Sequence, residues 1–186
     1  MKGGAITLIL AIAQSAARQK PAPDVSVYLT ASEATVSYPA KAMASSMFQA
    51  IGVEVAWLSG EPKAAPSGIT VRIHLAVDTP TGVKPGALAV SRPYAGFAKE
   101  ITVFYDRVRR LAEETRTPER ILLAHVLAHE ITHVIEQIDR HSETGLMKER
   151  WSREDYTNMA RKPLPFSPDD LYWIRQRLNP SASTHK

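Results

Sequence analysis

Cysteine is absent from this chain of 186 residues. Disulfide bonds and a cysteine nucleophile are therefore excluded, and histidine, aspartate and glutamate remain as the strong ligands for a metal ion. Blocks of lysine or arginine are absent as well, since the 23 basic and 19 acidic residues are interspersed and give a formal net charge of +4. We therefore expect no nucleic-acid partner.

The N-terminus carries a short apolar segment rather than a membrane span. Residues 1–17 begin with Met1 and Lys2, continue through an apolar stretch and end in small residues. The stretch of roughly nine apolar residues is too short to cross a bilayer, but its pattern resembles a secretory signal. A buried first strand or helix is the alternative. The proline-rich residues 18–24 suit a linker, so we expect a secreted or periplasmic protein without stable membrane insertion.

The remainder predicts one domain of α/β class. With 44% hydrophobic residues, the chain can bury a sizeable core, and we expect a single domain over residues 25–178 with a tail at 179–186. Periods of two and of 3.6 residues alternate along it. Strands are expected at residues 25–29, 53–58, 69–77, 86–91 and 101–105, the fourth at a sheet edge, and helices at about 39–50, 106–114, 117–138, 152–160 and 169–178.

The central motif is His129-Glu130-Ile131-Thr132-His133. Two histidines four residues apart share one face of a helix, so both imidazoles can reach one cation at about 2.0–2.1 Å. Glu130 flanks the same position and can take a proton from a water molecule there. The spacing therefore predicts a zinc-hydrolase site.

The surroundings of the motif predict a buried helix. Thr117, Pro118 and Glu119 form a helix start, with an N-cap hydroxyl, a proline in the first helical position and an acid in the first turn. Apolar residues cover more than one stripe of the run that follows. Polar side chains in such a helix need partners, which either a metal ion or hydrogen bonds within the core can supply.

His125 lies one helical turn before His129. It is eight residues from His133, about 12 Å along the helix axis, which is too far for all three rings to bind one ion. We therefore expect His125 to support the ligands or to pack beside them.

Further segments accompany the motif, namely residues 104–108, 124–130, 141–142, 145–147 and 151–155. With the motif they resemble metzincin-type zinc metallopeptidases, particularly small secreted bacterial proteins of this kind. The resemblance implies a twisted mixed sheet with a backing helix, an active-site helix and a small C-terminal helical subdomain. It implies one zinc ion per chain, with His129 and His133 as ligands, Glu130 as general base and Met147 in a methionine turn beneath the metal.

The third ligand departs from the usual metzincin spacing. That spacing places a glycine at position 136 and a ligand at position 139, where this chain has Glu136 and Asp139. Glutamate resists the left-handed conformation of such a turn, so we expect the helix to continue for another turn and His141 to be the ligand. A histidine of the small secreted proteins matches His141. Asp139 would then cap the helix end or orient His141 through its ring N–H.

Two other third ligands stay open. Asp139 matches the shorter spacing of snapalysin-like enzymes. Glu154 lies 21 residues beyond His133, a spacing similar to that of gluzincins, whose third ligand is a glutamate on a later helix.

The expected function is a monomeric zinc endopeptidase acting on a peptide or protein substrate. In the metzincin family an edge strand, here near residues 87–91, binds the substrate by strand addition. The alternatives are a metal hydrolase of a non-protein amide and a catalytically silent metal-binding module of the same fold.

Overall fold

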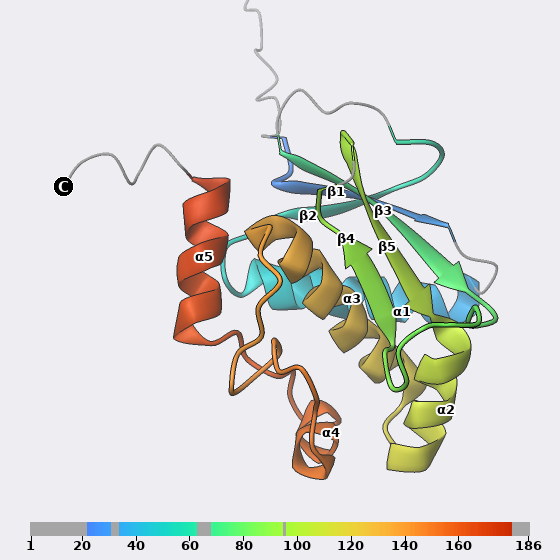
Figure 1. The fold of residues 1–186 in the computed structure, drawn as a ribbon. Coiled ribbons are helices and arrows are strands. Elements are labelled where there is room, and N and C mark those ends of the chain that lie inside the picture. Colours follow the sequence, from blue (N-terminus) through green and yellow to red (C-terminus); the bar gives the residue numbers. More distant parts are fainter. Residues whose placement is uncertain (1–21, 31–33, 63–67, 95, 180–186) are drawn as a thin grey trace, which may run out of the picture.

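A computed structural model describes residues 22–30, 34–62, 68–94 and 96–179. Within them the chain forms a mixed α/β fold with a five-stranded sheet and five helices (Figure 1). The expected signal at residues 1–17, most of the expected linker and the tail beyond Asn179 lie outside the described residues.

The sheet has the strand order β2-β1-β3-β5-β4. Its four parallel strands are β1 (Val25–Thr30), β2 (Val55–Leu58), β3 (Ile69–Ala76) and β5 (Ala98–Phe104). The fifth strand, β4 (Ala89–Arg92), pairs antiparallel with β5 and forms the edge, as the sequence predicts. The sheet therefore ends in a short strand whose outer backbone groups face away from the other four.

Alternation along β3 determines which face of the sheet is buried. Val71, Ile73 and Leu75 are buried, whereas His74 between them is exposed. The predicted extension of this strand to Val77 is wrong, because β3 ends at Ala76 and Val77 is 55% exposed.

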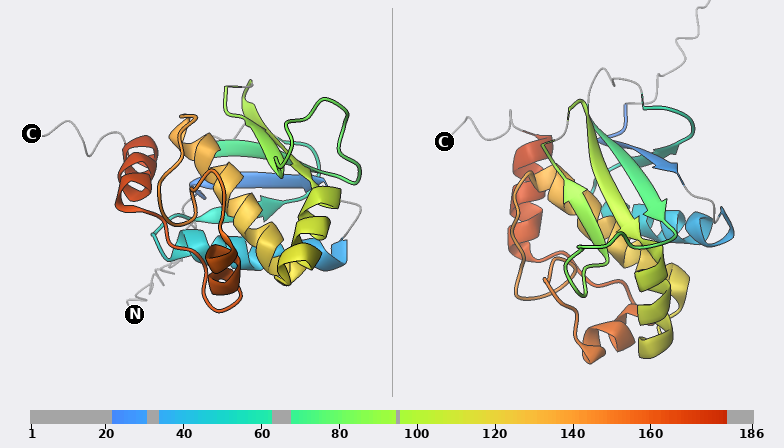
Figure 2. Two further views of the ribbon diagram at one scale, coloured as in Figure 1. Left: turned by 60° about the horizontal axis from the view of Figure 1, so that its bottom comes forward. Right: turned by 45° about the vertical axis from the view of Figure 1, so that its right-hand side comes forward.

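Two helices, α1 (Ala34–Gln49) and α3 (Glu119–Glu136), lie side by side under one face of the sheet (Figure 2). The core between these layers holds Ala44, Phe48, Val71, Ile73, Val103, Leu127, Ile131 and Ile135. α1 starts five residues before the expected Pro39, which stands inside the helix. A third helix, α2 (Tyr105–Thr115), follows β5 directly and packs on α3.

The expected start of α3 needs a correction. Pro118 is the N-cap residue and has no side-chain cap, while its carbonyl accepts from the N–H of Leu122 at 3.1 Å. Thr117 precedes the N-cap, and its hydroxyl, which lies 3.0 Å from the Thr115 hydroxyl, does not cap the helix. Burial therefore stabilises α3 more than capping does.

Two shorter helices follow, α4 (Arg153–Met159) and α5 (Pro168–Leu178). Each starts with a capping box, in which Ser152 or Ser167 and the acid three residues later bond each other's backbone N–H. The predicted N-cap role of Ser152 is confirmed. None of the helices in the described ranges combines the length and apolar character that crossing a bilayer requires.

Candidate metal centre

α3 carries the first two histidines on its buried surface. His129 is 8% and His133 is 6% exposed, and their Nε2 atoms are 3.0 Å apart. Every α3 residue from Leu122 to Glu136 is buried, so the helix has little freedom to move these rings. The helix thus positions both imidazoles from its backbone.

The end of α3 does not follow the expected path. The helix ends at Glu136, and Gln137 adopts the left-handed conformation with φ of 53°. Glu136 itself stays helical, as predicted, but the expected extra turn is wrong. The reversal occurs one residue later than a metzincin glycine would make it, at a residue that tolerates the left-handed region at a cost of about 1–2 kcal/mol.

The reversal brings His141 back to the first two histidines. Ligand nitrogens of His129, His133 and His141 all lie within 4.8 Å of one another. The ring centroids of His141 lie 5.4 Å from His129 and 4.9 Å from His133. These three side chains therefore form a group that could hold a metal ion.

Hydrogen bonds orient the two helical rings. Nδ1 of His129 donates to the Leu146 carbonyl at 3.0 Å, and Nδ1 of His133 faces the Ile138 carbonyl at 3.4 Å. Each Nδ1 therefore carries the proton, which leaves the Nε2 lone pairs directed at each other.

The protonation state of these rings suits a ligand. Burial lowers the pKa of His129 to about 3 and that of His133 to about 4, with further lowering from neighbouring histidines. Both rings are thus neutral near pH 7. Two lone pairs 3.0 Å apart repel each other unless a cation lies between them, and ligands of a tetrahedral zinc ion are about 3.3 Å apart. The donor set fits a metal ion, although imidazoles also accept copper, iron or nickel.

The chain after His141 is closed into a tight loop. Ser142 N–H donates to the Met147 carbonyl at 2.7 Å, and Leu146 N–H donates to the Pro165 carbonyl at 2.8 Å. Gly145 has φ of 75°, and a Cβ there would lie 2.2 Å from the Pro165 carbonyl oxygen. Only glycine fits this position. The loop places Met147, which is 1% exposed, in the core beneath the site.

A buried charge cluster anchors the chain next to His141. Arg140 donates to Asp170 of α5 at 2.7 Å and to Glu136 at 3.3 Å, and both carboxylates are fully buried. Asp170 also accepts from the Ser142 hydroxyl at 2.6 Å. Burial raises the pKa of Glu136 to about 7, although Arg140 opposes this shift. The sequence did not predict this cluster. Asp170 stands three residues after Ser167 at the start of a helix, and a capping box is a sufficient local reason for an acid there.

Glu130 lies beside the histidines but not in their group. Its side chain is 9% exposed, and burial raises its pKa to about 7. A hydrogen bond from the Ser91 hydroxyl lowers that pKa, and the charge of Asp139 raises it. Ser91 belongs to the edge strand β4, so Glu130 and the sheet edge meet here. Nothing in the sequence pattern indicates the role of Ser91.

The remaining predicted site residues are not part of the histidine group. His125 is fully buried, donates from Nδ1 to the Ile121 carbonyl at 2.8 Å and accepts from Leu164 N–H at Nε2 at 3.1 Å, so it packs rather than binds metal. Asp139 is exposed, and within the described ranges it shares no hydrogen bond with His141. Glu154 is exposed on α4 and is not part of the histidine group.

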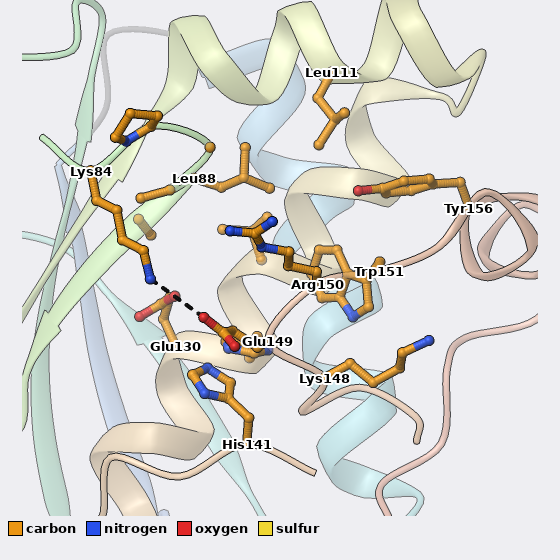
Figure 3. A pocket seen from close by; sticks show the side chains of 16 residues that line it. Lys84, Leu88, Leu111, Glu130, His141, Lys148, Glu149, Arg150, Trp151 and Tyr156 are labelled. Carbon is orange, nitrogen blue, oxygen red and sulfur yellow. Dashed lines mark hydrogen bonds and ion pairs between the residues drawn. The ribbon is translucent and has the colours of Figure 1, made fainter. Parts of the chain in front are cut away.

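A cleft of about 680 Å³ opens beside Glu130 and the histidines (Figure 3). One wall is the segment before and into β4, residues 84–89, and the opposite wall is residues 148–151. The apolar part of the lining consists of Pro85, Ala87, Leu88, Ala89, Leu111, Val126, Trp151 and Tyr156.

Comparison with known proteins finds no matching family and no matching curated protein. The function must therefore be argued from the site itself.

Proposed function

We propose that this chain is a zinc-dependent metallopeptidase of metzincin-like architecture. The observation that carries the proposal is the convergence of His129, His133 and His141. Glu130 is the sequence neighbour of His129 but is not a member of this group of possible ligands. Three protein ligands leave a fourth position open, which is the arrangement of catalytic rather than structural zinc sites.

The fold supports the same proposal. A mixed sheet ends in the short antiparallel strand β4, which borders the cleft directly above α3. An extended peptide could pair with the free edge of β4, and its backbone would then run past Glu130. This edge favours a peptide over a non-protein amide.

Each residue has a defined part in the chemistry. His129, His133 and His141 would hold the ion. A zinc ion there would supply a Lewis acid that polarises the scissile carbonyl and acidifies water. Glu130 takes the proton of the attacking water and delivers it to the leaving amine, which frees the product. The Ser91 hydroxyl bonds the Glu130 carboxylate and favours its charged form, which accepts the proton.

Replacement of Glu130 tests the proposal. In zinc-loaded protein, Glu130→Ala should lower peptide hydrolysis by about 10²–10⁴-fold, the usual contribution of a general base, while zinc content stays at one per chain. Glu154→Ala is the matched control, because this exposed glutamate lies outside the histidine group, and should leave hydrolysis and zinc content unchanged.

The readouts are cleavage of a broad peptide library by mass spectrometry and zinc content by elemental analysis. Absence of chelator-sensitive cleavage by the wild-type protein would overturn the proposed function. Loss of zinc from Glu130→Ala would instead make this carboxylate a ligand and the mechanism wrong.

A further inference from the structure

Three cationic side chains line the cleft: Lys84, Lys148 and Arg150. Lys84 is paired with Glu149 at 3.4 Å, and Lys148 is paired with Asp155 at 2.5 Å. In the part of the chain that the structure describes, Arg150 makes no ion pair or hydrogen bond through its guanidinium. Arg150 is thus the lining cation whose charge is left for a ligand.

The surroundings of Arg150 favour an anionic ligand. Its side chain points into the cleft, toward the wall that carries Leu88 (Figure 3). That first wall is largely apolar, and Trp151 adds an apolar ring to the opposite wall beside the charged Lys148 and Glu149, so a bound ligand would displace water from the guanidinium. A cation in such a place is stabilised by a carboxylate, because the planar guanidinium matches a carboxylate with two parallel hydrogen bonds.

A carboxylate of the protein lies on the adjacent residue of the chain, Glu149. It pairs with Lys84 of the opposite wall, as the dashed line in Figure 3 shows. Glu149 is therefore paired with Lys84 and not with Arg150. The guanidinium of Arg150 stays available in the cleft that Glu130 also lines.

We propose that Arg150 binds a substrate carboxylate and makes the enzyme selective for peptides with an acidic group next to the scissile bond. This inference rests on the proposed function for its chemistry. Two sources supply the same carboxylate: the side chain of an aspartate or glutamate, and the free C-terminus of a peptide. Arg150 is a specificity residue here, because it contacts the substrate away from the reacting atoms.

A peptide-library experiment with two arms separates these sources. One arm uses C-terminally amidated peptides that contain aspartate and glutamate. The other uses peptides without acidic side chains but with a free C-terminal carboxylate. Zinc-loaded wild-type protein, Arg150→Gln and the matched control Arg153→Gln, an exposed arginine outside the cleft lining, are compared by mass spectrometry of the cleavage positions.

The wild-type protein should cleave carboxylate-bearing peptides about tenfold better than their neutral counterparts in one arm, mainly through KM. Arg150→Gln should remove this preference, and Arg153→Gln should keep it. Enrichment in the first arm assigns side-chain carboxylates, and enrichment in the second assigns the C-terminus. Cleavage by the wild-type protein without preference in either arm would overturn the inference while leaving the proposed function intact.

A binding measurement keeps the inference testable even if no peptide is cleaved. Paired glutamate and glutamine peptides, each with a free and an amidated C-terminus, are titrated calorimetrically into the Glu130→Ala protein. Tighter binding of a carboxylate peptide, by about tenfold and only with Arg150 present, supports the inference. Equal binding of the acidic and neutral peptides to the Glu130→Ala protein that retains Arg150 contradicts it.

Discussion

The candidate metal centre is assembled from two regions that hold their ligands differently. α3 presents His129 and His133 from a helix that is buried along most of its length. The segment after α3 presents His141 from an irregular, exposed stretch. In α3 the hydrogen bonds of the helix backbone fix the positions of the two histidines. After α3, contacts of Arg140 and Ser142 with the distant Asp170 fix the position of His141.

This difference implies that substitutions in the two regions have different effects on stability and on metal binding. A substitution in α3 disturbs the core before it disturbs the site, because the helix packs against both α1 and the sheet. A substitution around His141 disturbs the loop first, because Arg140, Asp170 and Ser142 hold it through a few polar contacts. Three predictions test this contrast.

The largest expected effect is on metal affinity. His141→Ala should lower zinc affinity by about two to three orders of magnitude, because a binding free energy of about 10–16 kcal/mol shared among four ligands leaves roughly 2.5–4 kcal/mol for each. Asp139→Ala is the matched control. Its side chain is exposed and not bonded to His141, so it should change the affinity less than about tenfold, below the 10–100-fold that an orienting partner would cause.

A competitive titration against a chelator measures both affinities. A larger loss of zinc affinity in Asp139→Ala than in His141→Ala would make Asp139 the third ligand, at the shorter spacing that snapalysin-like enzymes have.

The next effect concerns the charge cluster that anchors the loop. Asp170→Ala should lower the free energy of unfolding by about 3 kcal/mol, because it leaves the Arg140 guanidinium beside α3 without its closest partner and removes a helix cap. Zinc affinity should fall as well, since Arg140 precedes His141. Denaturant unfolding and zinc titration measure the two quantities.

Asp169→Ala provides the comparison for this variant. It changes the neighbouring, exposed residue in the same helical turn, and its effect on stability should stay below about 1 kcal/mol. An equally stable Asp170→Ala protein would show that the loop does not depend on this cluster.

The smallest effect is a pH dependence in the same cluster. Because the pKa of Glu136 is raised from 4.5 to about 7, the native protein binds this proton more tightly than the unfolded chain does, and stability is lost as pH rises from about 5 through 7. Glu136→Gln should therefore be more stable than the wild-type protein at pH 8, by roughly 1–2 kcal/mol, but not at pH 4.

Urea unfolding of the metal-free proteins at both pH values measures this difference, and the contributions of the histidines cancel in the comparison. Glu143→Gln, an exposed site, should show no such pH dependence. A stability difference that is the same at pH 4 and pH 8 would contradict the assignment.

The two regions also differ in how far the sequence predicts them. α3 and the pairing of His129 with His133 follow from helical periodicity, and the five strands follow from alternation. The approach of His141 was expected, but through an added helical turn that does not form, because Gln137 takes the left-handed conformation. Local pattern does not show which residue will accept such strain.

The contacts that the sequence does not predict join residues far apart along the chain. Arg140 meets Asp170 across 30 residues, and Ser91 meets Glu130 across the sheet edge. Each residue also has an ordinary local explanation, such as a helix cap or an edge position. Only packing of the distant segments brings them together.

We propose that three histidines from these two regions bind one metal ion. X-ray absorption at the zinc edge of the loaded protein counts the imidazole ligands directly. We expect three imidazoles at about 2.0–2.1 Å with one oxygen ligand, and two imidazoles after His141→Ala. Two imidazoles and a carboxylate in the wild-type protein, or an unchanged spectrum after His141→Ala, would contradict it.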